Sequence, residues 1–125
     1  MKNILPKKIS VFPLRGAIFF PETNLPLNIF EERYLNMIED SLKADGFIGM
    51  IQSRKVEGDV FNVGCLGRID KHERTNDGRI LINLKGLTRF RVGEEINNKK
   101  LYREFFVNYD EFKDDIRKKK YEIEN

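Results

Sequence analysis

The sequence has little of several residue types on which common protein classes depend. It contains one cysteine, one histidine and no tryptophan among 125 residues. The single cysteine, Cys65, forms no disulfide within the chain, which excludes disulfide-rich secreted scaffolds and favours a reducing compartment. No apolar run approaches the roughly 20 residues of a membrane helix, and none near the N-terminus has the form of a signal peptide. The sequence therefore predicts a cytoplasmic protein without a membrane segment.

Residues with catalytic or metal-binding chemistry are also scarce. The phosphate-binding pattern Gly-x4-Gly-Lys-Ser/Thr is absent, and His72 has no second ligand at the spacing of a zinc-binding helix. Cys65 and His72 lie on one predicted strand, about 23 Å apart and on opposite faces if that strand is regular. This placement excludes a hydrogen-bonded nucleophile and base. We therefore expect no enzyme activity, no metal site and no cofactor.

Proline and apolar patterns in the first half predict short strands around one helix. All four prolines lie at or before Pro26, so segments 11–14 and 17–30 are expected to form short edge or bulged strands. A helix at about 29–44 is predicted by apolar residues that recur every four positions: Phe30, Tyr34, Ile38 and Leu42. Asn28 is its expected cap with Glu31, and Glu39 and Lys43 its expected surface ion pair. Gly46 ends it.

The second half has the pattern of a β-sheet. A buried strand at 47–51 and a surface loop at 52–59 precede a hairpin centred on Asp77-Gly78. An even-length loop would place Ile80, Ile82 and Leu84 on the same sheet face as Ile69, Gly67 and Cys65, so we favour that register. Further strands are expected after Gly86 and at 101–109.

The C-terminal segment differs in composition from the rest of the chain. Residues 111–125 are rich in charge, and Phe112 and Ile116 have the spacing of one helical turn. We expect this short segment to bury little. The predicted division is a β-rich domain at 1–110 followed by a charged, potentially helical segment at 111–125.

Positive charge is concentrated in one region although the total is modest. The chain has 23 Lys and Arg against 20 Asp and Glu, a net charge of +3. The basic cluster comprises Arg68, Lys71, Arg74, Arg79, Lys85, Arg89 and Arg91. Such a cluster attracts phosphate or acidic polypeptide by its summed field. The alternative is the solvated outer face of a sheet.

Several motifs together resemble a known family. They occur in the order Val11-Phe-Pro-Leu14, Phe19-Phe-Pro21, Leu25-Pro-Leu-Asn-Ile-Phe-Glu31, Arg33-Tyr34, Val63-Gly-Cys65, Asp77-Gly-Arg79 and Gly86-Leu-Thr-Arg-Phe-Arg-Val92. Over residues 9–92 this pattern is similar to the N-terminal, substrate-binding domain of Lon proteases, and to free-standing proteins without the ATPase or protease modules. The resemblance implies a mostly β (α+β) fold, a PUA-like β pseudobarrel with one main amphipathic helix.

The resemblance also implies a function. It suggests a non-catalytic module that binds unfolded or degron-bearing polypeptide and works with a protease or chaperone. Candidate contacts for exposed apolar segments are Phe19, Phe20, Tyr102, Phe105 and Phe106. RNA binding through the basic cluster is the alternative, because PUA-like barrels also occur in RNA-modifying proteins. Self-association through the aromatic region after Leu101 is a third hypothesis.

Overall fold

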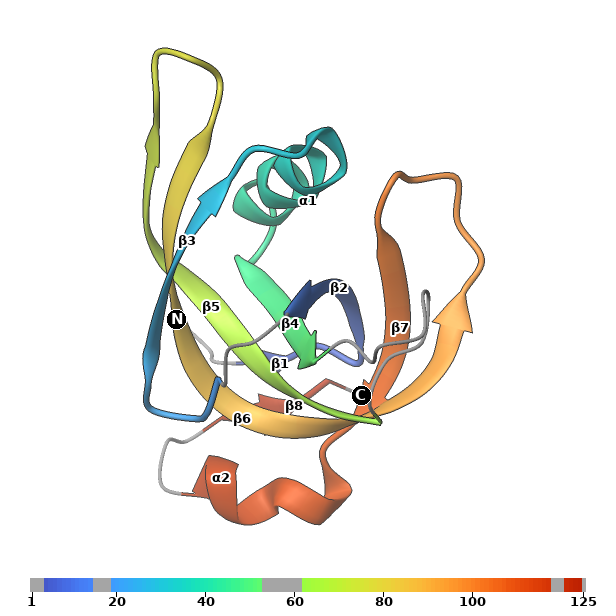
Figure 1. Ribbon diagram of the computed structural model, residues 1–125. Coiled ribbons are helices and arrows are strands. Elements are labelled where there is room, and N and C mark those ends of the chain that lie inside the picture. Colours follow the sequence, from blue (N-terminus) through green and yellow to red (C-terminus); the bar gives the residue numbers. More distant parts are fainter. Residues whose placement is uncertain (1–3, 15–18, 53–61, 118–120, 125) are drawn as a thin grey trace.

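A computed structural model describes residues 4–14, 19–52, 62–117 and 121–124 of the chain. Strands dominate it, and one helix lies on the outside of the sheet (Figure 1). In chain order the elements are β1 (Ile4–Leu5), β2 (Lys8–Leu14), β3 (Asn24–Ile29), α1 (Glu32–Leu42), β4 (Phe47–Gln52), β5 (Val63–Arg74), β6 (Ile80–Ile96), β7 (Arg103–Asn108), the 3-10 helix η1 (Asp110–Phe112), α2 (Lys113–Arg117) and β8 (Glu122–Ile123).

Five strands close into a ring. The six-stranded sheet has the order β3-β6-β5-β4-β2-β7, and β7 pairs again with the far end of β6. The length of β6 makes this closure possible, because its first part pairs with β5 and β3 while Arg91–Ile96 pairs with β7. All pairs in the ring are antiparallel except β2 with β4. The ring confirms the expected mostly β pseudobarrel.

Two apolar cores lie on opposite sides of the ring wall. One core takes buried side chains from every strand of the ring, so it fills the barrel interior: Ile9, Val11, Ile51, Leu66, Phe90, Phe105 and Val107. The other lies between the outer wall and α1 and includes Tyr34, Met37, Ile38, Ile48, Met50, Cys65, Ile82 and Leu84. Both cores are continuous hydrophobic clusters, which explains how so short a chain holds a barrel and a packed helix.

The helix was predicted in the right region, but its start was wrong. Glu31 is the N-cap and makes no capping hydrogen bond through its side chain. Asn28 lies in β3 rather than at a cap, and Phe30 is 67% exposed rather than part of the buried helix face. Glu39 pairs with Arg74 of β5 instead of Lys43. Gly46 has a φ of +78°, as expected of the left-handed residue that follows a helix.

The proline-containing strands differ in position. β3 is an edge strand, as predicted, but β2 has neighbours on both sides. The reason is that β7 pairs only with Lys8–Val11 and β4 only with Val11–Leu14. Pro13 therefore borders a single strand, which removes the conflict between proline and an internal position.

The hairpin forms at the predicted turn with a different register. Arg74 pairs with Ile80, so the loop has an odd length, and Ile80 and Ile82 are opposite the polar residues Arg74 and His72. A bulge between Ile69 and Lys71 then shifts the register by one residue and restores Leu84 opposite Ile69.

The predicted break between strands at Gly86 is wrong, because β6 continues through this residue. The strand at 47–51 is confirmed, and most of the expected loop at 52–59 lies outside the described residues.

The charged C-terminal segment packs onto the barrel. Phe112 and Ile116 are 9% and 6% exposed, so the expectation that this segment buries little is wrong. Ile116 joins the core of the barrel interior, and β8 pairs with β1 near the N-terminus. The division at residue 110 stays a prediction.

No helix among the described residues is long and apolar enough to cross a membrane.

Candidate functional site

The aromatic candidates divide into exposed and buried residues. Phe20 and Phe106 are 55% and 50% exposed, whereas Phe19, Tyr102 and Phe105 are buried. The buried three are core residues here, because Phe19 and Tyr102 pack beneath α1 and Phe105 fills the barrel. Their role in binding stays a prediction without direct support, and Phe20 and Phe106 remain the accessible candidates.

Phe20 belongs to a tight turn that is fixed across β6. The Thr23 hydroxyl donates to the carbonyl of Phe20 at 2.7 Å and accepts from its amide at 3.2 Å. The Gly86 amide donates to the carbonyl of Thr23 at 2.8 Å, and the Glu22 amide donates to that of Gly86 at 2.9 Å. These bonds fix the backbone of the turn that carries Phe20.

An apolar pocket of about 180 Å³ lies next to Phe20. Its lining includes Leu14, Phe19, Phe20, Met50, Cys65 and Arg89. Cys65 is 3% exposed and its thiol donates to the carbonyl of Leu66, so it is a small buried apolar residue, as expected. The pocket can accept an apolar side chain next to an exposed aromatic ring.

Phe106 lies on another part of the barrel. It pairs with Lys8 of β2, and its carbonyl lies 2.8 Å from the position that a Cβ of Gly93 would take. Phe20 lies against Gly86, seven residues earlier in β6. The structure therefore places the two exposed candidates on separate parts of the barrel surface rather than in one patch.

Tyr102 lines a second pocket, of about 230 Å³, between the end of α1 and β7. Its hydroxyl donates to Asp40, and burial, with this carboxylate, raises the pKa of Tyr102 well above its usual value. Glu104 at the same pocket is buried and accepts from Asn98 at 3.0 Å and Lys100 at 3.2 Å. Tyr102 and Glu104 thus each have a polar partner, which is typical of a structural network.

Most of the basic cluster is paired with acids. Arg89 donates through Nε and Nη2 to Asp115 at 3.0 and 3.1 Å. Arg91 makes the same two-point contact with Glu111 at 2.8 and 2.7 Å. Hydrogen bonding raises the pKa of Arg91 and lowers the pKa of Glu111. Two of the seven cations are thus neutralised by η1 and α2.

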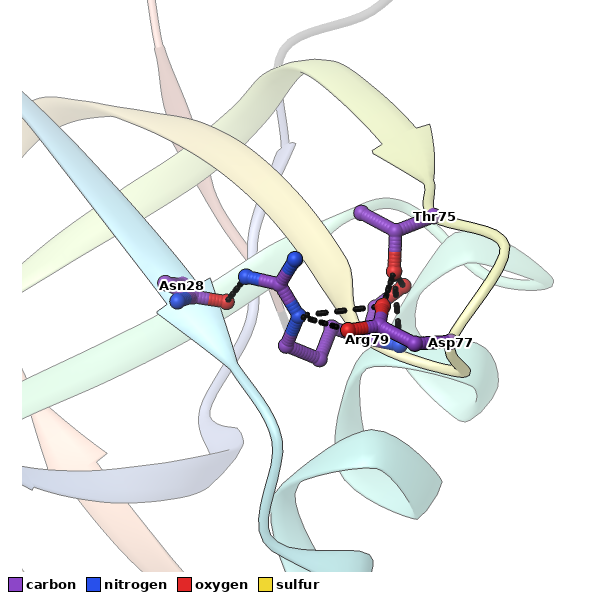
Figure 2. Close-up of polar contacts among 4 residues, drawn as sticks. All are labelled: Asn28, Thr75, Asp77 and Arg79. Carbon is purple, nitrogen blue, oxygen red and sulfur yellow. Dashed lines mark hydrogen bonds and ion pairs between the residues drawn. The ribbon is translucent and has the colours of Figure 1, made fainter.

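The hairpin end of the cluster is neutralised in the same way. Figure 2 shows Arg79 reaching between the turn and β3, where its Nε donates to Asp77 at 3.0 and 3.1 Å and a terminal nitrogen to Asn28 at 3.2 Å. Thr75 hydrogen-bonds the same carboxylate, and these hydrogen bonds lower the pKa of Asp77. Arg74 pairs with Glu39 of α1.

The other three cations of the cluster are Arg68, Lys71 and Lys85. Arg68 donates to the carbonyl of Asp45 at 3.0 Å and stacks over Phe47 at 4.8 Å. Lys71 and Lys85 are exposed and make no ion pair within the described part of the chain. The cluster is therefore a set of arginines that join strands and helices, with a few free lysines, rather than a continuous basic surface.

Sequence reasoning missed the exposure of Phe30, which follows β3. The signal was present, because Asn24–Ile29 alternates polar and apolar residues and places Leu25, Leu27 and Ile29 on one face. Continued by one residue, the alternation puts Phe30 on the exposed side with Asn28. The helical period that Phe30 shares with Tyr34 hid this pattern.

Comparisons with known proteins agree with this architecture. Residues 8–124 match the family model described as the ATP-dependent protease La (LON) substrate-binding domain. Lon protease 2 of Myxococcus xanthus is 30% identical over 99 residues, which are 74% of this chain and 12% of that protein. Lon protease of Dictyoglomus thermophilum is 30% identical over 95 residues, again 12% of its length. The chain thus spans about one eighth of the length of the curated relatives it matches.

Solved structures show the same fold. A Lon N-terminal domain protein from Xanthomonas campestris has a TM-score of 0.68 and 26% identity, covering 81% of this chain and 58% of that one. The N-terminal domain of a Mycobacterium avium complex Lon protease has a TM-score of 0.65 at 16% identity, covering 82% and 54%. With the family model matching nearly the whole chain, the chain belongs to the Lon substrate-binding domain family.

Proposed function

We propose that this domain is a non-catalytic module that binds unfolded polypeptide through exposed apolar side chains. The observation that carries the proposal is the exposure of three phenylalanines on a barrel of the Lon substrate-binding family: Phe20, Phe30 and Phe106. Exposed aromatic rings contribute large apolar contact areas when a partner covers them. A module of this kind acts on a polypeptide by holding it, and a protease or chaperone then acts on the held chain.

The pocket beside Phe20 gives this proposal a specific contact. Its wall is mainly apolar, and Phe20, on a turn with an ordered backbone, is one of its lining residues. A turn that is already ordered beside a preformed apolar pocket loses little entropy when a side chain enters. Affinity for one segment is expected to be weak, because an unfolded ligand must be ordered on binding.

Binding is tested with a reduced and alkylated polypeptide that stays unfolded in buffer, labelled for fluorescence anisotropy. The proposal expects saturable binding to this chain and none to its native, folded form. A double Phe20→Ala and Phe106→Ala variant should bind several-fold more weakly, whereas Lys43→Ala on the exposed side of α1 should bind like the parent. Absence of saturable binding to a panel of such unfolded chains would refute the function.

RNA binding has less support than polypeptide binding. Four of the seven cations in the basic cluster are paired with carboxylates, so their field at the surface is largely cancelled. An RNA oligonucleotide titrated at about 50 and 200 mM salt tests this, because true phosphate contacts lose affinity steeply between these concentrations. We expect no such salt-dependent binding.

A cytoplasmic location stays a prediction from the single cysteine.

A further inference from the structure

The edge of β3 is open. β3 is the terminal strand of the six-stranded sheet and pairs only with β6 among the strands that the structure describes. The other terminal strand, β7, is closed by its second pairing with β6. An unpaired strand edge offers a row of backbone donors and acceptors that another extended chain can use.

The register shows which backbone groups point outward. The Gly86 amide donates to the carbonyl of Thr23 at 2.8 Å, so the backbone of Thr23 faces β6. Backbone direction alternates along a strand, so Leu25, Leu27 and Ile29 also face β6. The outward groups are therefore the amides of Asn24 and Asn28 and the carbonyls of Asn24, Pro26 and Asn28. All three of these residues are exposed.

This edge lacks the usual protection against pairing. Natural proteins commonly guard edge strands with charged side chains. The run from Thr23 to Phe30 carries no charge in a chain that is 34% charged, and it ends in the exposed ring of Phe30. Pro26 is the only guard, and it removes one of three outward amides. The edge is thus accessible over five residues to a chain that tolerates one missing hydrogen bond.

Side-chain contacts hold both ends of the edge in place. Asn83 of β6 donates to Asn24 at 3.1 Å, and Arg79 donates to Asn28 at 3.2 Å (Figure 2). Both contacts leave the outward backbone groups of β3 unused. A strand fixed in this way is preorganised, so a pairing chain pays little for ordering it.

We propose that an extended segment of unfolded polypeptide binds by adding a strand to the free edge of β3. This inference rests on the proposed function and names the form of its ligand. Main-chain hydrogen bonds supply affinity without regard to sequence, and side chains on alternate positions supply preference. Leu25 and Leu27 are half-buried on the side of the core beneath α1, so apolar residues at alternate positions of the ligand extend that core.

A polypeptide fits the edge better than a second copy of this chain. Two β3 strands paired about a two-fold axis would each contribute Pro26, so the ladder would lack two donors at the centre of a short interface. An external peptide meets Pro26 once and can place a residue with an unused carbonyl opposite it. The ligand is therefore an extended segment with alternating apolar residues.

Amide exchange with water, measured residue by residue by NMR, tests the inference directly. The probe is an eight-residue peptide of alternating valine and threonine, without charge at its centre. Its binding should slow exchange at Asn24 and Asn28, while Leu25 and Leu27, already bonded to β6, act as internal controls. Binding of the peptide without slower exchange at Asn24 and Asn28 would overturn the strand-addition mode and leave polypeptide binding intact.

A pair of variants at one position gives an independent test. Asn28→Pro removes an outward amide, whereas Asn28→Ala keeps it and loses the same contact with Arg79. We expect Asn28→Pro to bind the peptide about fivefold or more weakly than Asn28→Ala, consistent with the loss of one backbone hydrogen bond. Equal affinity of two folded variants, or protected edge amides in a peptide-free dimer seen by sedimentation, would overturn the inference. Failure of every unfolded chain to bind would instead refute the proposed function.

Discussion

Gly86 shows how one residue without a side chain fixes the turn that carries Phe20. A Cβ added at Gly86 would lie 2.1 Å from the carbonyl oxygen of Phe20. Gly86→Ala must therefore move the turn and strain its hydrogen bonds to β6, so we expect a loss of roughly 1–3 kcal/mol in the free energy of unfolding. Urea denaturation measures it, with the exposed neighbour variant Lys85→Ala expected within about 0.5 kcal/mol of the parent. Matching midpoints for the two variants would contradict this account.

Phe30 and Ile38 provide a second test at single residues. Phe30 is 67% exposed, whereas Ile38 is fully buried in the core beneath α1. Phe30→Ala should change the free energy of unfolding by no more than about 0.5 kcal/mol, and Ile38→Ala should cost about 2–5 kcal/mol through lost burial and a cavity. Thermal unfolding of the two variants decides. A large loss of stability in Phe30→Ala would mean that Phe30 packs in the core.

At the scale of residues, the sequence predicts burial well where the apolar residues follow only one pattern, either the helical period or the strand alternation. Tyr34 and Ile38 are buried as the helical period requires, and Cys65 is buried as a small residue between glycine and leucine should be. The errors fall where two periods meet. Phe30 fits the helical period of Tyr34, but the alternation of β3 places it on the exposed side with Asn28.

The C-terminal segment is attached to β6 through Asp115, which gives a prediction at the scale of elements. Asp115 accepts from the backbone amide of Arg89 at 3.0 Å as well as from its guanidinium, and its side chain is only 12% exposed. Asp115→Ala leaves these donors without a partner and should cost roughly 1–3 kcal/mol.

Asp114 is the matched control for this prediction. It carries the same charge, but its side chain is 86% exposed and pairs with Arg117 at 2.9 Å. Asp114→Ala should change the free energy of unfolding by less than about 1 kcal/mol. If Asp114→Ala and Asp115→Ala gave the same urea midpoint, the segment would not be held by this contact.

Helices, strands and turns were predictable where the local sequence determines them. They were not predictable where pairing with residues distant in the chain determines them. Asp77-Gly78 marks the hairpin, and Gly78 has the positive φ that such a turn needs. The odd-length loop and the bulge at Asp70 could not be predicted from the sequence. The conformation of the turn sets the register of the residues next to the loop, and pairing within the sheet sets the register beyond the bulge. The packing of Phe112 likewise depends on a barrel surface formed by residues far away in the chain.

At the scale of the whole molecule, charge pairing reduces the positive field that the basic cluster presents to solvent. Arg89 and Arg91 meet their acids about 20 or more positions later in the chain, and Arg74 meets Glu39 35 positions earlier. Sequence alone shows the cations together and the acids elsewhere. Folding brings each acid to its cation, so the net surface field is much weaker than the local count suggests.

Alkaline pH should destabilise the molecule through its buried tyrosines. Burial raises the pKa of Tyr109, whose hydroxyl donates to the carbonyl of Pro6 and ties β7 to the N-terminal strand region. The unfolded chain loses this proton near the ordinary pKa of about 10, while the native state keeps it. The contribution of Tyr109 to the free energy of unfolding is therefore constant below about pH 9 and falls as pH rises beyond 10, with Tyr102 acting in the same direction.

Tyr109→Phe separates this proton linkage from packing. The variant should lose about 1 kcal/mol at neutral pH with the hydrogen bond to Pro6, because the ring that fills the core remains. It should also lose less stability than the parent between about pH 9 and 11, since the titrating group is gone. Urea denaturation at several pH values measures both effects. Parallel curves for the parent and Tyr109→Phe would show that the alkaline loss arises at other groups.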